Sequence, residues 1–240
     1  MASRRSNVLQ ERFFNCLISG DRHASREIVS QAIDEEASAE IIMSHLFWPT
    51  TEMLQNLHRN DQLSSLSYHY ATRLLRSLVD QMQLRLEKRN ERNETILLVC
   101  GEEESEELAA QMAADLLEAD GYKVFFAGGG VANDEVVEQL GELKADKLVI
   151  YGAIPATVPQ TRLLIDRLHE IGVCPQVQII VGGGVFNRAD GLAEEIGADL
   201  WAKTPSELVQ VMGDRPERRM TEDQRTVGRK RRATATQEAA

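Results

Sequence analysis

The 240-residue chain has few cysteines, few aromatic residues and no long apolar run. Its three cysteines, Cys16, Cys100 and Cys174, are too widely spaced for a disulfide scaffold or a zinc site, so we expect buried thiols. No apolar stretch approaches the roughly 20 residues that span a bilayer. No signal-peptide-like segment follows the two N-terminal arginines. The sequence therefore predicts a cytoplasmic protein that does not enter a membrane.

Positive charge is scarce outside the C-terminal segment. The formal net charge is -11, although residues 215–240 carry eight basic and four acidic side chains. Binding of nucleic-acid phosphates requires clustered Lys and Arg, so the acidic remainder argues against a broad nucleic-acid interface on the folded part. Residues 214–240 are predicted to form a basic disordered tail. This tail is either simply solvated or contacts nucleic acid or an acidic partner.

The first 93 residues lack the alternation that is typical of strands. Apolar residues recur instead at spacings of three and four, which indicates helices. Turn and capping residues interrupt this pattern at 19–21, 36–38 and 59–62 and divide it into four helices. The last of them is expected to run from about residue 64 to 92. Residues 1–93 are therefore predicted to form a helical cap, a four-helix bundle.

Short apolar runs separated by helical stretches characterise residues 94–213. The runs occupy residues 95–100, 123–127, 147–151, 177–181 and, more weakly, 199–202. Continuous apolar runs of this length are typical of strands that are buried on both faces. Five such strands alternating with helices predict a flavodoxin-like (Rossmann-like) α/β domain with a parallel sheet. Ligands of such sheets bind beyond the carboxyl ends of the strands, where the strand order reverses.

Two of the loops at that edge carry polar candidates for a ligand site. Glu102 and Glu104 follow the first strand, and they either begin a helix, where the dipole favours carboxylates, or contact a cofactor or metal. After the third strand come Gly152, Ile154 and Thr157, which offer small side chains, exposed backbone and one hydroxyl. Both loops are predicted to line a cleft.

A glycine triplet, Gly182, Gly183 and Gly184, follows the fourth strand. Glycine lets another group approach the backbone closely and adopts dihedral angles that other residues resist. The triplet is interpreted either as a tight turn or as the floor of a cleft for a ligand tail. A second triplet at 128–130 follows the second strand, and there a turn is the preferred interpretation.

The order of these elements resembles a vitamin B12 (cobalamin)-binding domain. The similarity covers residues 95–212 and rests on the acidic loop and on segments 118–124, 145–150, 181–184 and 197–199. The helical half resembles the cap that precedes this domain in methionine synthase, corrinoid proteins and light-responsive B12 regulators. The resemblance implies cobalamin as cofactor, held by the loops at the carboxyl edge.

The sequence departs from this family at two motifs. An Asp-x-His-x-x-Gly motif of the family supplies the histidine that ligates cobalt from below, and here Glu102, Glu104 and Glu107 take its place. A Ser-x-Leu motif, whose hydroxyl faces the nucleotide tail, is reduced to Gly152-Ala-Ile154. The lower-ligand motif is thus degenerate, and its carboxylates would repel the phosphate of the corrinoid.

Two histidines of the helical half are candidate metal ligands. In the light-responsive regulators, a helix carries Trp, His and Arg ahead of a Glu-His pair, which His58 and Tyr68-His69 partly match. The resemblance therefore implies His58 and His69 as contacts to the upper face of cobalt. The alternative interpretation makes both ordinary surface or core side chains.

No catalytic set is visible in the sequence, and corrinoid chemistry belongs to the cofactor, so we expect a protein that is not an enzyme. The leading hypothesis is a cobalamin-binding, or formerly cobalamin-binding, regulator or sensor with a protein partner. The alternatives are a corrinoid carrier subunit for a methyltransferase and a ligand-free interaction scaffold. A phosphorylation receiver shares the fold, but the third strand ends in Tyr151-Gly152, without the phosphoacceptor carboxylate.

Overall fold

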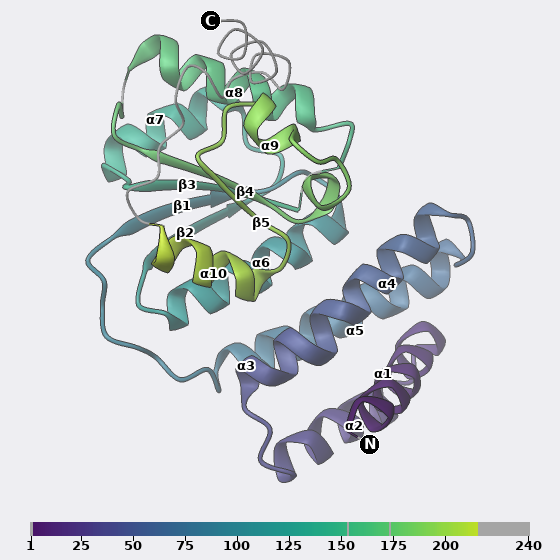
Figure 1. The fold of residues 1–240 in the computed structure, drawn as a ribbon. Coiled ribbons are helices and arrows are strands. Elements are labelled where there is room, and N and C mark those ends of the chain that lie inside the picture. The colour runs from purple at the N-terminus through teal and green to yellow at the C-terminus, as the bar shows by residue number, and fades with distance from the viewer. Residues whose placement is uncertain (1, 153, 173, 216–240) are drawn as a thin grey trace, which may run out of the picture. The chain divides into compact units, whose positions relative to one another are not determined.

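The computed structural model describes residues 2–152, 154–172 and 174–215. The chain divides into two compact units, Met1–Lys88 and Arg89–Ala240 (Figure 1). The predicted basic tail lies, from residue 216 onward, outside the described residues. Within the described part, no helix has both the length and the hydropathy needed to cross a membrane.

The first unit is helical. Its elements are α1 (Ala2–Ser19), α2 (Arg22–Asp34), α3 (Ala39–Ile42), the π-helical turn η1 (Met43–Phe47), α4 (Trp48–Arg59) and α5 (Ser65–Gln83). Because α3, η1 and α4 follow one another without a break, the described unit has four successive helical segments, as the sequence predicted. Their core contains Phe13, Leu17, Phe47, Leu54, Leu75, Leu78 and Met82.

Helix α5 ends at Gln83, so the prediction that it continues to residue 92 was wrong. Leu84 is 84% exposed, and the polar segment beyond it has too few apolar side chains to bury a further helical face. The end of this segment belongs to the second unit instead. The Arg92 guanidinium lies 2.6 Å from the Asp120 carboxylate, and its backbone N–H donates to Gly121 O at 2.9 Å.

The second unit is a flavodoxin-like α/β domain, which confirms the predicted fold class. Its elements are β1 (Thr95–Val99), α6 (Glu104–Ala119), β2 (Lys123–Gly128), α7 (Asn133–Leu143), β3 (Lys147–Tyr151), α8 (Val158–Ile171), β4 (Gln178–Gly182), η2 (Gly184–Asn187), α9 (Leu192–Glu195), β5 (Leu200–Ala202) and α10 (Pro205–Asp214). The strands are parallel in the order β2-β1-β3-β4-β5, so the order reverses between β1 and β3.

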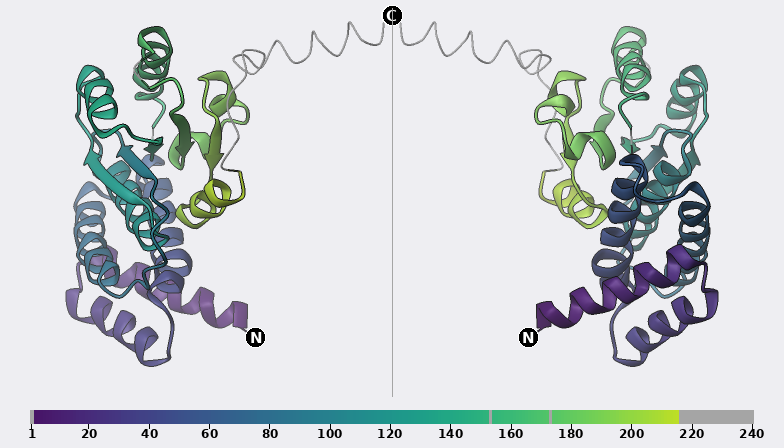
Figure 2. Two further views of the ribbon diagram at one scale, coloured as in Figure 1. Left: turned by 90° about the vertical axis from the view of Figure 1, so that its left-hand side faces the viewer. Right: turned by 90° about the vertical axis from the view of Figure 1, so that its right-hand side faces the viewer.

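Helices cover both faces of this sheet. Figures 1 and 2 show α6 and α10 on one face and α7 and α8 on the other. Successive side chains of a strand point to opposite faces. In β3, Leu148 and Ile150 belong to the core under α7 and α8. Tyr151, the next residue, therefore points toward the α6 and α10 face.

Candidate functional site

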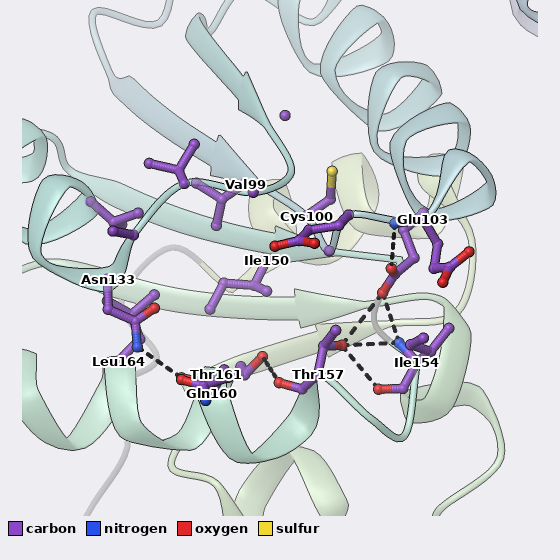
Figure 3. Close-up of a pocket in the computed structure, with 18 of the residues that line it drawn as sticks. Val99, Cys100, Glu103, Asn133, Ile150, Ile154, Thr157, Gln160, Thr161 and Leu164 are labelled. Carbon is purple, nitrogen blue, oxygen red and sulfur yellow. Dashed lines mark hydrogen bonds between the residues drawn. The ribbon is translucent and has the colours of Figure 1, made fainter.

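A cleft of about 750 Å³ opens at the carboxyl edge of the sheet, between the loops after β1, β2 and β3 and the first turns of α7 and α8 (Figure 3). It lies where the strand order reverses, which is the expected place for a ligand in this fold. Its floor is apolar and includes Val99, Val136, Ile150 and Leu164. A volume of this size is typical of sites for small organic molecules.

Polar and small residues form the rim of the cleft. They are Cys100, Gly101, Glu102, Glu103, Gly128, Gly130, Asn133, Asp134, Ala156, Thr157, Gln160 and Thr161. Asp134 is paired with Arg167 at 2.8 Å, whereas no Lys or Arg lines the cleft among the residues described. The carboxylates therefore make the local potential negative, which favours neutral or cationic ligands with N–H donors over phosphates.

Glu106 joins two of the loops beneath this rim. Its side chain is almost fully buried, at 1% exposure. One carboxylate oxygen accepts hydrogen bonds from the Ile154 N–H (2.9 Å) and the Thr157 hydroxyl (3.4 Å). The other accepts from the Glu103 N–H at 3.1 Å. Burial raises the pKa of the Glu106 carboxyl above its ordinary 4.5, although the backbone N–H groups of Glu103 and Ile154 oppose this rise.

Gly152 serves the packing of these loops. A Cβ atom at this position would lie 2.8 Å from the Glu106 carbonyl oxygen, and the residue has φ +86°. Gly129 plays the same part after β2, because a Cβ there would lie 2.0 Å from the Gly101 carbonyl oxygen. Both glycines thus permit a close approach of protein backbone.

Gly182 and Gly183, at the end of β4, leave a recess, here called the glycine cradle, that the protein fills itself. Gly182 pairs in register with Tyr151 of the neighbouring strand. A Cβ atom would lie 2.5 Å from Cε2 of the Tyr151 ring at Gly182, and 3.0 Å from Cε1 at Gly183. Tyr151 is fully buried, and its hydroxyl donates to the Lys203 carbonyl at 3.4 Å. The ring therefore occupies the space that the second interpretation of the triplet gave to a ligand tail.

The predicted cofactor contacts are divided between these two places. Glu102, Ile154 and Thr157 line the cleft. Glu104 begins α6, and Gly152 packs against the backbone of Glu106. Gly182 and Gly183 face the Tyr151 ring, and Gly184 begins η2. Sequence reasoning missed the roles of Tyr151 and Glu106. The sequence shows an aromatic residue at the end of one strand and glycines at the end of the next, but it does not show that the ring faces these glycines.

The two candidate metal ligands lie close together where α4 ends and α5 begins. The His58 ring stacks on Tyr68, with centroids 4.0 Å apart and planes 12° apart. His69 meets the same tyrosine edge-on at 6.3 Å and is exposed. The described residues contain no cluster of three or more His, Cys, Asp or Glu that could hold a metal ion.

The three cysteines form no disulfide, but they are partly exposed rather than buried as predicted. Burial still raises the pKa of the thiols of Cys16 and Cys174. Cys100 lines the cleft.

A cobalamin with its nucleotide tail inserted at the glycine cradle does not fit these residues. The Tyr151 ring fills the cradle, and the loop after β1 offers carboxylates where an imidazole would be needed below cobalt. The open cleft lies on the other side of the sheet edge, above the core that α7 and α8 cover. Any corrinoid held here must leave its tail outside the cradle.

Several curated relatives of this chain are corrinoid proteins. Trimethylamine corrinoid protein 2 of Methanosarcina acetivorans is 27% identical over 142 residues, 58% of this chain and 64% of that protein. Monomethylamine corrinoid protein 2 of Methanosarcina barkeri is 30% identical over 107 residues, 44% and 48% of the two chains. The chain thus spans about half to two thirds of the length of these relatives.

Comparisons with a solved structure and with protein families lead to the same family. The Methanosarcina barkeri monomethylamine corrinoid protein shares the fold, with a TM-score of 0.73 at 17% identity over 87% of this chain and 98% of the other. One B12 binding domain family matches residues 94–209, and a second matches residues 9–83. The chain therefore belongs to the B12-binding domain family, with a helical cap and an α/β module in one polypeptide.

Proposed function

We propose that this chain is a corrinoid carrier protein, which holds a corrinoid at the carboxyl edge of its α/β unit and presents it to a partner methyltransferase. The observation that carries this proposal is the presence of both B12 binding domains in one chain. Relatives named as methylamine corrinoid proteins favour a carrier over the regulator that the sequence analysis put first. On this proposal the chain itself is not an enzyme.

The residues of the cleft would bind the corrinoid through its neutral parts. When bound, the corrinoid supplies the reactive metal centre. Glu102 and Glu103 would accept hydrogen bonds from peripheral amide N–H groups of the ligand, while Val99 and Ile150 exclude water from the floor. Glu106 would keep the two loops at a fixed separation through its three hydrogen bonds.

A ligand-free interaction scaffold is the second candidate, and a specific observation favours it. The Tyr151 ring fills the cradle that one interpretation of the sequence gave to a ligand tail. A chain that had lost its cofactor would gain stability by filling this space with an apolar side chain. The fold and its partner surface could then persist without a corrinoid.

A binding experiment separates the carrier from the scaffold. The purified full-length chain is mixed with hydroxo-, methyl- or adenosylcobalamin and desalted, and its visible spectrum is recorded. A carrier retains stoichiometric colour with at least one form. A protein that emerges colourless from all three mixtures contradicts the carrier and leaves the scaffold.

The upper-face ligands can be tested on the coloured protein. If His58 or His69 contacts cobalt, its replacement by Ala shifts the visible absorption bands, because the axial ligand sets the electronic spectrum. His23→Ala is the matched control, since the His23 side chain is 84% exposed and the sequence gives it no ligand context. Bands that stay the same in both His58→Ala and His69→Ala exclude this role.

A further inference from the structure

We infer that Tyr151 permanently closes the tail site of the α/β unit, so that the chain binds corrinoids without recognising their nucleotide tail. The inference deepens the proposed function and rests on corrinoid binding for its affinity readout. A variant without the Tyr151 ring tests the closed tail site even if the natural chain binds no corrinoid. The closed tail site and the carrier function can therefore be refuted independently.

The position of the ring follows from the strand register. Tyr151 is the last residue of β3 and lies opposite Gly182, the last residue of β4. Because Ile150 belongs to the core under α7 and α8, Tyr151 must point to the other face. There the absence of side chains at Gly182 and Gly183 leaves room for one aromatic ring, and the ring takes it.

Several contacts hold the ring in this place. The hydroxyl donates to the carbonyl of Lys203, which directly follows β5. Two ring carbons lie against Gly182 and Gly183, and the side chain has 0% exposure. A tail could enter only if this buried ring moved into solvent, which would expose a large apolar surface and leave a cavity. The closed state is thus built into the fold of the domain.

The charges on the neighbouring loop oppose a tail as well. A nucleotide tail carries a phosphate, and the loop between β1 and α6 presents Glu102 and Glu103 as exposed carboxylates. The buried Glu106 ties this loop to Ile154 after β3 and leaves no free N–H from that pair for a phosphate oxygen. These charges lower the affinity for a tail, whereas the Tyr151 ring alone excludes it by packing, so removal of the ring is the decisive change.

The test compares cobalamin with cobinamide, which lacks the nucleotide. Affinities of the full-length chain for aquocobalamin and diaquocobinamide are measured by visible titration. For the natural chain we expect equal affinities. Tyr151→Ser opens the cradle, so its affinity for cobalamin should exceed that for cobinamide by about tenfold or more, because the tail can then make contacts that cobinamide lacks. Tyr151→Phe is the matched control, because it keeps the ring, and its ratio should stay at one.

Folding of each variant is checked by circular dichroism, and Tyr151→Leu, which keeps more apolar volume, replaces the Ser variant if that variant unfolds. A natural chain that prefers cobalamin tenfold, or an opened variant that gains no preference, overturns the inference. If the natural chain binds neither corrinoid but the opened variant binds cobalamin, the inference stands and the carrier proposal fails. If folded opened variants also bind neither, both fail.

Discussion

The two sides of the carboxyl edge differ sharply in what fills them. On the side covered by α6 and α10, the Tyr151 ring is fully buried, packs against Gly182 and Gly183, and donates a hydrogen bond to the Lys203 carbonyl. On the side covered by α7 and α8, a cleft with an apolar floor stays open. Consecutive residues of β3, Ile150 and Tyr151, thus face an open and a closed site. A family fold can therefore be retained while one side chain decides which ligand parts can enter.

The largest effect expected from this comparison is the loss of the Tyr151 ring. Tyr151→Ala should lower the free energy of unfolding by about 3–5 kcal/mol, because it removes a fully buried aromatic side chain and leaves a cavity. Urea unfolding is followed by the fluorescence of Trp201 in a Trp48→Phe background, since Trp201 is the only tryptophan of the α/β unit.

The matched variant on the open side is Leu164→Ala. Leu164 lines the cleft, and its side chain, although only 4% exposed, is smaller than that of Tyr151, so its truncation should cost less. A loss for Leu164→Ala that equals or exceeds the loss for Tyr151→Ala would contradict the distinction between a closed and an open side.

The next largest loss of stability is expected for a substitution in the glycine cradle. Gly182→Ala should destabilise the unit by about 1–3 kcal/mol, because the new Cβ would lie 2.5 Å from the Tyr151 ring and 2.7 Å from the Ala202 carbonyl oxygen. In the Tyr151→Ser background the cost should fall, although the Ala202 contact keeps it above zero. A double-mutant cycle by urea unfolding measures this coupling. Additive costs would show that the ring and the glycine do not share this space.

Glu106→Ala should cost about 1–3 kcal/mol at low pH, because the Glu103 N–H loses its buried acceptor and the Ile154 N–H keeps only the Thr157 hydroxyl at 3.2 Å. The stability that Glu106 contributes should also fall as the pH rises. Burial raises the pKa of Glu106 in the folded state, so its stabilising contribution is complete below the ordinary pKa of 4.5 and is lost as pH rises through the folded pKa. The stability difference between the natural chain and the variant should therefore be larger at acidic pH than at pH 8. A constant or rising difference contradicts the assigned burial effect.

The fold could be predicted from the sequence, because short apolar runs report strands that are buried on both faces and need no knowledge of neighbours. The closed site at Tyr151 could not be predicted in this way. Tyr151 ends an apolar run in which every residue is buried, so the pattern does not say which face it points to. Only the register with β4 places it against Gly182.

The acidic loop shows the same limit for charged residues. Glutamates fill five of the six positions from 102 to 107, and nothing in their order marks Glu106 as the buried one. Its role depends on the Ile154 and Thr157 donors, which lie about fifty residues later in the chain. Side chains whose function depends on long-range partners therefore stay hidden in a single sequence, whereas the helix-start role of their neighbours was foreseeable.

The smallest expected effect on stability is at the rim of the open side. Glu102 is exposed, so Glu102→Gln should change the unfolding free energy by less than about 0.5 kcal/mol. If the cleft binds ligand amides, the same substitution should weaken corrinoid binding, because it removes a charged acceptor while keeping the side-chain shape. Urea unfolding and visible titration of one variant thus measure the two quantities separately. A large loss of stability with unchanged binding would mean that Glu102 belongs to the packed side of the edge, and the contrast between the two sides would no longer hold there.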